Sequence, residues 1–314
     1  MKVLVTGGSG FIGNHVVNKL LAHGIDVRIL DMLAPPAARK GVEFTKGSIL
    51  NIDDVRTSLH RTDAVIHLAA VADVRDVFNE PHYAEAINVR GTANVLEAMR
   101  QVGQKRVIFG STTWVYSDVV ETDVDETTPL LPPSHLYTAT KISGEHYCQS
   151  YSKLYGLEPT ILRFGIPYGP GARPGAVIPI FVDKAVKGEP LTLQGDGLQF
   201  RKFIYVEDLA EGIVAGLKPI AINQTYNLDG QYKVSIKEIA ETIKKILGEV
   251  AIEYVEARPG DFVGKDASSA KALRDLNWQA TTAFEDGVRR YIDWFQAQGR
   301  ERVESLSRVD PALL

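Results

Sequence analysis

The chain opens with Met1-Lys2-Val3-Leu4-Val5-Thr6-Gly7-Gly8-Ser9-Gly10-Phe11-Ile12-Gly13, a short apolar strand that runs directly into a glycine-rich turn. Gly7, Gly10 and Gly13 have the spacing G-x-x-G-x-x-G, and an amphipathic helical pattern follows them. Side chains at these positions would keep the backbone away from a pyrophosphate, whereas free N–H groups at a helix start attract an anion. The stretch therefore predicts a strand, a turn and a helix that together bind a dinucleotide.

A second apolar strand, Asp26 to Leu30, supports this interpretation because it ends in an acid. Asp31 lies roughly 20 residues beyond the glycines, which is the spacing of such a motif. A carboxylate at this position accepts hydrogen bonds from a ribose 2′-OH and repels a 2′-phosphate. We therefore expect NAD and not NADP.

Composition and charge exclude several classes of protein. The 314 residues suffice for about two domains, and 45% hydrophobic with 24% charged residues is ordinary for a globular protein. A net charge of −4 without a basic block argues against a nucleic-acid partner. The single cysteine, Cys148, excludes an intrachain disulfide, and the seven histidines show no metal-ligand spacing. No apolar run is long enough for a membrane span and no signal peptide is recognisable, so we expect a cytoplasmic protein.

Strand and helix patterns alternate through the first half of the chain. Strands are expected over 26–30, 42–46, 64–70, 106–109 and 158–164, with helices at 51–60, 83–102 and 135–155. This order predicts an α/β fold built on a doubly wound parallel sheet.

Prolines and glycines crowd the segment from Pro167 to Pro179, where no regular element is expected. We therefore predict a nucleotide-binding domain over residues 1–166 and a smaller mixed α/β substrate domain over 167–314. Part of residues 195–217 is expected to pack back on the first domain. Within the second domain we expect helices at 178–187, 206–217, 235–247, 267–276 and 284–298, and strands at 191–193, 225–228 and 252–255.

Two further motifs carry side chains that can move protons. Tyr137 and Lys141 stand four residues apart near a helix start, so they share one face, and a cation beside a phenol favours the tyrosinate. The segment from Ser111 to Tyr116 follows a buried strand, which brings hydroxyls to the edge where doubly wound sheets bind ligands. Taken alone, each pattern also fits an ordinary surface helix or a polar strand exit.

In combination these motifs make the sequence resemble the extended short-chain dehydrogenases/reductases, specifically the nucleotide-sugar epimerase and dehydratase family, and most of all its UDP-hexose 4-epimerases. The resemblance spans nearly the whole chain. It rests on Thr6 to Gly13, Asp31, His67-Leu68-Ala69-Ala70, Asn88-Val89-Arg90-Gly91-Thr92, Ser111 to Tyr116, Tyr137-x-x-x-Lys141, Tyr168-Gly169-Pro170, Gly195-Asp196-Gly197 with Arg201, Val206-x-Asp208-Leu209 and Arg258-Pro259-Gly260-Asp261.

The resemblance implies a Rossmann domain that holds NAD, and it implies roles for individual residues. Tyr137 would be the general base, Lys141 would hold the nicotinamide ribose and lower the tyrosine pKa, and Thr112 would orient the sugar. The implied cofactor-binding residues are Gly7, Gly10, Phe11, Ile12, Gly13, Asp31, Ser48, Ile49, Leu68, Ala69, Ala70, Asn88, Tyr137 and Lys141. The implied substrate-binding residues are Thr112, Thr113, Trp114, Ile166, Arg173, Val177, Arg201, Arg258 and Asp261, with Arg201 and Arg258 on the diphosphate.

The residues after Thr112 favour one activity within this family. Dehydratases of the family typically have Asp-Glu there, and UDP-glucuronate decarboxylases have a Glu, whereas this chain has Thr113-Trp114. An indole cannot do acid–base work, so a reaction that needs only a hydride and one proton is favoured. That reaction is epimerisation.

Two positions, Ile166 and Arg173, leave the substrate open, and a third, Ser48, concerns the cofactor. Ile166 stands where the family usually has an Asn that contacts the substrate's phosphates. Ser48 replaces an Asp that meets the adenine amino group, although its hydroxyl can still accept a hydrogen bond. Arg173, in a loop expected to border the sugar pocket, would either pair with a hexuronate carboxylate or lie in solvent.

We therefore predict an NAD-dependent 4-epimerase that interconverts UDP-glucose and UDP-galactose. The alternatives are a UDP-glucuronate 4-epimerase, a nucleotide-sugar dehydrogenase or reductase, and a non-catalytic NAD-binding regulatory protein. Family analogy suggests a homodimer built on helices within 83–99 and 146–155. We expect no metal, no nucleic-acid partner and no membrane partner.

Overall fold

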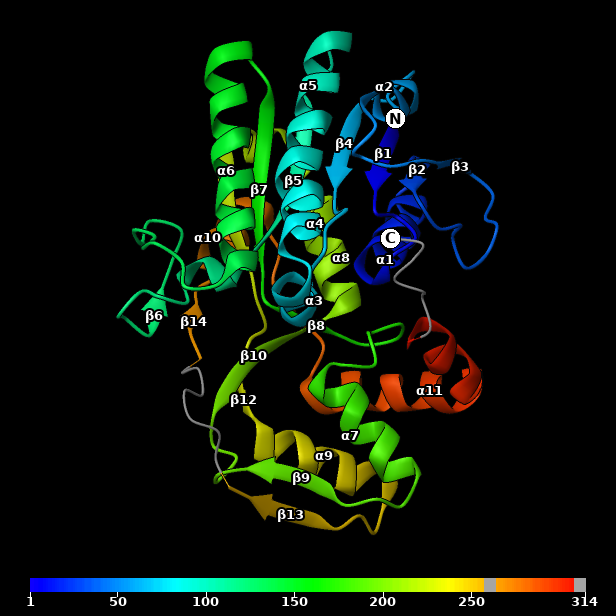
Figure 1. Cartoon of the computed structure of the whole chain (residues 1–314), viewed down its shortest axis with the longest axis vertical. Helices are drawn as coiled ribbons and strands as arrows, with labels where there is room; N and C mark the ends of the chain where they lie inside the picture. The colour runs from blue at the N-terminus through cyan, green and yellow to red at the C-terminus, as the bar shows by residue number, and fades with distance from the viewer. Residues whose placement is uncertain (257–263, 308–314) are drawn as a thin grey trace.

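The computed structural model describes residues 1–256 and 264–307, with side chains described up to residue 297. Its main sheet has seven strands, all parallel, in the order β11, β7, β5, β4, β1, β2, β3 (Figure 1). The strands are β1 (Lys2–Thr6), β2 (Asp26–Asp31), β3 (Val42–Lys46), β4 (Ala64–His67), β5 (Arg106–Thr112), β7 (Glu158–Phe164) and β11 (Gln224–Leu228). The doubly wound parallel sheet expected from the sequence is confirmed.

Helices cover both faces of this sheet. One face is covered by α2 (Ile52–Ser58), α5 (Thr92–Val102) and α6 (Leu136–Tyr155), whose apolar side chains pack on the central strands. Cys148 of α6 is fully buried in that layer, as expected of a packing residue. The other face is covered by α1 (Phe11–Ala22) and α8 (Val206–Ala215). Because both faces are covered, a strand such as β4 is buried along its whole length, which explains its continuous apolar sequence.

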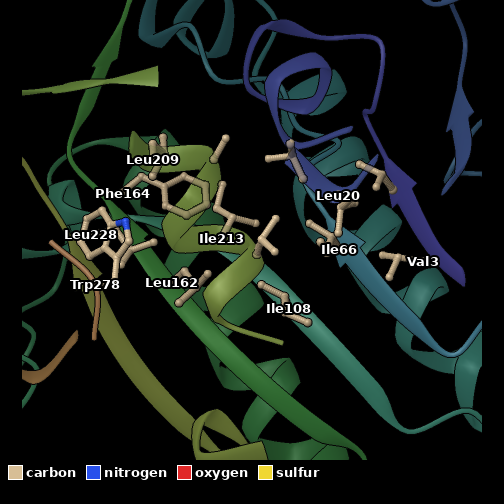
Figure 2. Packing of buried hydrophobic residues seen from close by; sticks show 14 of the residues in the cluster. Val3, Leu20, Ile66, Ile108, Leu162, Phe164, Leu209, Ile213, Leu228 and Trp278 are labelled. Carbon is tan, nitrogen blue, oxygen red and sulfur yellow. The ribbon is translucent and has the colours of Figure 1, made fainter. Parts of the chain in front are cut away.

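The chain returns to the main sheet after the expected domain boundary. Leu209 and Ile213 of α8 pack beside Phe164 of β7 and Leu228 of β11 (Figure 2). The strand expected at 225–228 in the smaller domain is β11, and it pairs with β7 at the edge of the main sheet. The expected return of part of residues 195–217 is thus seen in α8, whereas a division at residue 166 into independent domains stays a prediction.

The helix expected over 83–102 is built from three pieces. These are α4 (Pro81–Glu85), the π-helical turn η1 (Ala86–Gly91) and α5, and a short helix α3 (Val74–Asn79), absent from the sequence prediction, precedes them. π-helical turns inside helices often mark functional sites. This one contains Asn88.

The smaller part of the molecule gathers below the carboxyl edge of the sheet (Figure 1). A three-stranded sheet of β8 (Ile166–Tyr168), β10 (Phe200–Tyr205) and β12 (Lys233–Ser235) lies nearest, and β9 (Leu191–Gln194) pairs with β13 (Ile252–Val255) beyond it. The strands β8, β10 and β12 were not expected from the sequence. Helices α7 (Val177–Val186), α9 (Ile236–Leu247) and α11 (Phe284–Ser307) close this part, and α9 begins at a capping box formed by Ser235 and Glu238.

The remaining elements are short. They are the 3₁₀ turns η2 (Thr113–Tyr116) and η3 (Pro219–Ala221), the paired strands β6 (Asp123–Val124) and β14 (Asp266–Ala267), and α10 (Ala270–Leu276). Among the residues that the structure describes, no helix has the length and apolar character needed to cross a membrane.

Candidate functional site

The glycine turn between β1 and α1 has the geometry of a phosphate cradle. Gly7 adopts a left-handed conformation with φ +71°, and a Cβ there would meet Ala69 N at 2.7 Å. A Cβ on Gly13 would meet the Gly7 carbonyl oxygen at 2.1 Å. Gly10 precedes α1 without a capping side chain, and the first helical turn contains no acidic residue. The helix start therefore presents bare N–H groups, which suits an anion.

Asp31 joins this turn to the end of β2. Its Oδ2 accepts a hydrogen bond from Ser9 N at 3.0 Å and its Oδ1 accepts one from Leu33 N at 3.1 Å. Each carboxylate oxygen keeps acceptor capacity for a ribose hydroxyl. Ser9 Oγ is buried and has no hydrogen-bond partner among the described residues, which marks a place for a polar group of a ligand. The residues at the ends of β1 and β2 therefore fit a dinucleotide with a free 2′-OH.

The predicted adenine-side residues follow β3. Ser48 N donates to Asp54 Oδ2 at 3.0 Å, and Ser48 Oγ accepts from Leu50 N at 3.2 Å. Ile49 is buried against Gly91, where a Cβ would meet its side chain at 2.5 Å. Residues 68–70, which follow β4, are half-buried beside the glycine turn. The carboxyl ends of β1, β2, β3 and β4 thus bring these segments to one edge of the sheet.

Asn88 holds this edge together. Its Oδ1 accepts from Val71 N at 2.8 Å, and its Nδ2 donates to Val71 O at 2.9 Å and to Thr140 Oγ1 at 3.0 Å. The buried amide thereby ties the loop after β4 to helix α6. Its observed role is to position that loop, and a contact between Asn88 and the cofactor stays a prediction.

Tyr137 and Thr112 meet where α6 passes the end of β5. Burial raises the pKa of Tyr137 to about 12, and the charge of Arg173 and a hydrogen bond with the Thr112 side chain oppose that rise. Thr112 is itself buried, and its Oγ1 accepts from Trp114 N at 3.2 Å. The two side chains therefore lie near each other at the end of β5, whereas their roles in a reaction stay a prediction.

Lys141 lies one turn further along α6 and does not act on the tyrosine in this structure. Its Nζ donates to the Gly110 carbonyl at 2.9 Å and lies 5.2 Å from the centre of the Phe109 ring. Burial lowers the pKa of Lys141 to about 8, and the charge of Glu145 opposes that change. The pKa of Tyr137 is thus raised and not lowered, because burial outweighs the opposing charge of Arg173 and the hydrogen bond with Thr112.

Arg173 comes from the loop between β8 and α7. Its side chain is half exposed, and its Nη1 lies 3.2 Å from Asp73 Oδ2. The prediction that this loop borders the site is consistent with the effect of Arg173 on Tyr137. The alternative of an arginine lying free in solvent does not apply, because its guanidinium is paired.

The other predicted substrate residues lie on separate elements around this edge. Thr113 and Trp114 form the start of η2, and the Trp114 ring packs edge-on against His135 with centroids 5.9 Å apart. Ile166 in β8 and Val177 at the start of α7 are partly buried against the core of the smaller part. Arg201 lies in β10 and donates from Nη1 to the Phe200 carbonyl at 2.7 Å. The predictions for Arg258 and Asp261 lie outside the described residues.

Helix α1 connects the cofactor side to the substrate side, in part through His15, which is absent from the sequence prediction. His15 Nε2 lies 2.8 Å from the Pro170 carbonyl, and Phe11 packs at the edge of the smaller core. Ile12, on the next position of the helix, packs instead on the core of the main sheet. No sequence signal could identify His15, because its partner is 155 residues away along the chain.

A buried ion pair lies beneath the site. Glu145 of α6 accepts from Ser111 Oγ at 2.6 Å and from Arg163 Nη2 at 2.7 Å, and both charged side chains are almost fully buried. Arg163 Nη1 donates to Tyr116 Oη at 2.6 Å, and Tyr116 donates to Asn227 Oδ1 at 3.0 Å. The network therefore joins α6, β5, β7 and β11 directly below Thr112 and Lys141.

The assembled groups can bind a dinucleotide and take a proton from a substrate hydroxyl. His67, buried between Thr6 and Thr92, stays neutral because burial lowers its pKa to about 3, in accord with its interpretation as a buried residue at a strand end. No group of three or more potential metal ligands occurs within residues 1–256 and 264–307. The chemistry that these residues support is proton abstraction beside a hydride-accepting cofactor.

Comparison with known proteins points to one family. The sequence model of the "NAD dependent epimerase/dehydratase family" matches residues 3–229. The chain is 34% identical over 307 residues to a putative UDP-glucose 4-epimerase of Methanocaldococcus jannaschii, covering 95% of this chain and 99% of that protein.

Two solved structures are similar over almost their whole length. One is the UDP-glucose 4-epimerase of Thermotoga maritima with UDP-glucose, at TM-score 0.88 and 30% identity over 95% of this chain and 99% of that chain. The other is the UDP-glucuronic acid 4-epimerase of Bacillus cereus in complex with UDP-glucuronic acid and NAD, at TM-score 0.87 and 30% identity over 95% of this chain and 100% of that chain.

Proposed function

Because this chain belongs to the NAD-dependent epimerase/dehydratase family, we propose that it is a nucleotide-sugar 4-epimerase that interconverts UDP-glucose and UDP-galactose. The observation that carries the proposal is the composition of the site around the reacting tyrosine. The Thr112 side chain lowers the pKa of Tyr137, in opposition to burial, and the residues directly after Thr112 are Thr113 and Trp114. Neither of them can serve as the additional acid or base that an elimination requires.

The proposed reaction begins with the removal of a proton from the C4 hydroxyl of the hexose. Tyr137 takes this proton while Thr112 holds the same oxygen in place. NAD, when bound in the cradle, supplies the oxidising chemistry by accepting a hydride from C4 and giving it back. Tyr137 then returns the proton after the keto-sugar has turned its other face, so acid and base are one residue.

The surrounding cations make the phenol a usable base. A tyrosine with a pKa of about 12 keeps its proton at neutral pH and so cannot accept another, which is why positive charge near it is needed to favour the tyrosinate. Arg173 supplies such a charge in this structure. The family resemblance assigns a second contribution to Lys141, on the ribose side, once the dinucleotide lies between the two residues.

A UDP-glucuronate 4-epimerase is the second candidate. Arg173 favours it, because a guanidinium beside Tyr137 could pair with the carboxylate of a hexuronate. The similarity to a UDP-glucuronic acid 4-epimerase supports it too. A nucleotide-sugar dehydrogenase or reductase would bind NAD in the same cradle but would leave the cofactor reduced or oxidised after each turnover. A regulatory protein would bind NAD there without catalysing a reaction.

One experiment separates these candidates. The purified protein is incubated, without added cofactor, with UDP-glucose, UDP-galactose, UDP-glucuronate and their N-acetyl counterparts, and the sugars are analysed after hydrolysis. We expect interconversion at C4 of UDP-glucose and UDP-galactose with no net change in NADH absorbance. A stoichiometric absorbance change would indicate a dehydrogenase or reductase, and no C4 interconversion of any sugar would refute the epimerase proposal.

By the same resemblance we propose a homodimer that forms through α5 and α6. Tyr147, Leu154 and Tyr155 on α6 are 40%, 70% and 50% exposed, which leaves apolar surface for a second copy. Light scattering should then give twice the mass of one chain.

A further inference from the structure

An acidic residue at the rim of the site has no role in the reaction described above. Asp73 follows the loop after β4 and caps α3, where its Oδ1 accepts from Arg75 N at 2.9 Å. Its Oδ2 lies 3.2 Å from Arg173 Nη1, and Arg75 Nε lies 3.6 Å from its Oδ1. The Asp73 side chain is only 17% exposed, whereas that of Arg173 is 50% exposed.

The loop between β8 and α7 is shaped around this cluster. Gly175 of this loop lies against the second guanidinium, because a Cβ built there would come within 2.2 Å of Arg75 Nη2. Asp73 Oδ2 lies 3.9 Å from the same point. Two guanidinium groups from two segments, α3 and the loop, therefore enclose one carboxylate.

The loop that carries Asp73 is held next to the reacting tyrosine. Asn88 bonds both Val71 and Thr140, and Thr140 Oγ1 donates to the Tyr137 carbonyl at 2.7 Å. Burial raises the pKa of Tyr137 and the charge of Arg173 opposes that rise, in keeping with a guanidinium at this edge of the site. Any negative group that a substrate brings beside Tyr137 would have to share Arg173 with Asp73. The repulsion between the Asp73 carboxylate and a negative group of the substrate would weaken binding and so select against negatively charged substrates.

We propose that Asp73 determines the charge of the sugar that this site accepts: its carboxylate occupies Arg173 and thereby selects nucleotide sugars with a neutral group at C6 over hexuronates. This inference rests on the proposed epimerase function and names the substrate class of that site. Arg173 alone would attract a hexuronate carboxylate, but a guanidinium already paired with Asp73 loses that preference.

The test compares kcat/KM for UDP-glucuronate and UDP-glucose in the wild-type protein and in Asp73→Asn. Asparagine keeps the N-cap of α3 and nearly the same volume while removing the charge. We expect the ratio of the two values, glucuronate over glucose, to rise at least about tenfold, equivalent to about 1.4 kcal/mol of discrimination. The double variant Asp73→Asn with Arg173→Gln should lose this gain, because the freed guanidinium is then absent.

Asp76→Asn is the matched control. Asp76 lies three residues further in the same helix and is exposed, so the substitution removes the same charge away from Arg173. In this control, the ratio of kcat/KM for UDP-glucuronate over UDP-glucose should stay within about twofold of the wild-type ratio. That is well below the change of about tenfold expected for Asp73→Asn. If the ratio of kcat/KM values rose equally in Asp76→Asn, the change would come from the overall charge of the protein and not from the position of Asp73, and the proposal would be overturned.

A binding measurement keeps this test independent of turnover. Calorimetry gives the Kd values of UDP-glucuronate and UDP-glucose for the Tyr137→Phe protein and for the same protein that also carries Asp73→Asn. If Asp73→Asn fails to fold, Asp73→Ser is used in its place. An unchanged ratio of Kd values overturns the role of Asp73. Absence of epimerisation by the wild-type protein, together with a changed ratio of Kd values, overturns the proposed function and leaves the charge selection standing.

Discussion

At the scale of single residues, the proposed reaction depends on what lowers the pKa of the partly buried Tyr137 phenol. Burial raises the pKa of Tyr137, and the opposing contributions come from Arg173 and Thr112. Lys141, the cation expected at this position, donates instead to the Gly110 carbonyl. The pKa of the proposed base is therefore lowered by a residue 36 positions beyond it, in the loop between β8 and α7.

Replacing Tyr137 by Phe removes the proton acceptor and leaves the ring in place. We expect epimerisation to fall by at least about 100-fold, the usual contribution of a positioned acid or base. NAD should remain bound, because the cradle is built from β1, β2 and β4; its content is measured by absorbance after denaturation. Tyr254→Phe, an exposed tyrosine of β13, is the control and should retain full activity. Retained turnover in Tyr137→Phe would exclude Tyr137 as the base.

At the scale of elements, the position of helix α6 decides whether its side chains reach the site. Its first turns are held by the hydrogen bond between Asn88 and Thr140, from the π-helical turn. Further along, Glu145 is held by Arg163 of β7 and by Ser111 of β5. These two anchors fix the segment that carries Tyr137 and Lys141 relative to the strand ends.

The buried pair of Glu145 and Arg163 should show strong coupling in a double-mutant cycle. Glu145→Gln and Arg163→Met each leave one buried charge unpaired, so each should lower the free energy of unfolding by about 3–5 kcal/mol. The double variant should lose clearly less than the sum, because no unpaired charge remains. Urea denaturation measures all four proteins, and strictly additive losses would show that the two side chains are not coupled.

At the scale of the whole molecule, the chain crosses repeatedly between the main sheet and the smaller part. Residues 167–200 leave the sheet, and α8 and β11 bring the chain back before it leaves again. Figure 2 shows the result, with side chains of α8 packed among residues of β7, β11 and Trp278. The core of the nucleotide-binding part is therefore completed by residues from beyond position 200.

The fragment comprising residues 1–166 tests this dependence. It lacks α8 and β11, so apolar side chains of β7 and α1 would be exposed, at about 1.5–3 kcal/mol for each large residue. We expect the fragment to show no cooperative thermal transition and no NAD binding, whereas the full chain shows both. Circular dichroism and calorimetry measure the two properties. A fragment that unfolds cooperatively and binds NAD would instead support independent domains divided at residue 166.

The order of strands and helices was predictable because it depends on local patterns. Apolar runs, the glycine turn and capping residues act over a few positions, and they correctly predicted the six strands of the main sheet before residue 166 and most helices. The strands β8 and β12 escaped prediction because each has three residues, and β10 escaped because it forms by pairing with these two segments from distant parts of the chain. The π-helical turn escaped because nothing in its sequence distinguishes it from an α-helix.

What the sequence by itself determined is the chemistry available in this protein: a glycine cradle, an acid for the ribose, a threonine, a tyrosine and a lysine. The tertiary structure alone decided which charges meet. Asp73 and Arg173 are 100 positions apart, yet their ion pair stands beside Tyr137, and Lys141 faces a carbonyl instead of the phenol. The physical reason is that electrostatic effects depend on distance and burial in three dimensions, and neither can be read from spacing along the chain.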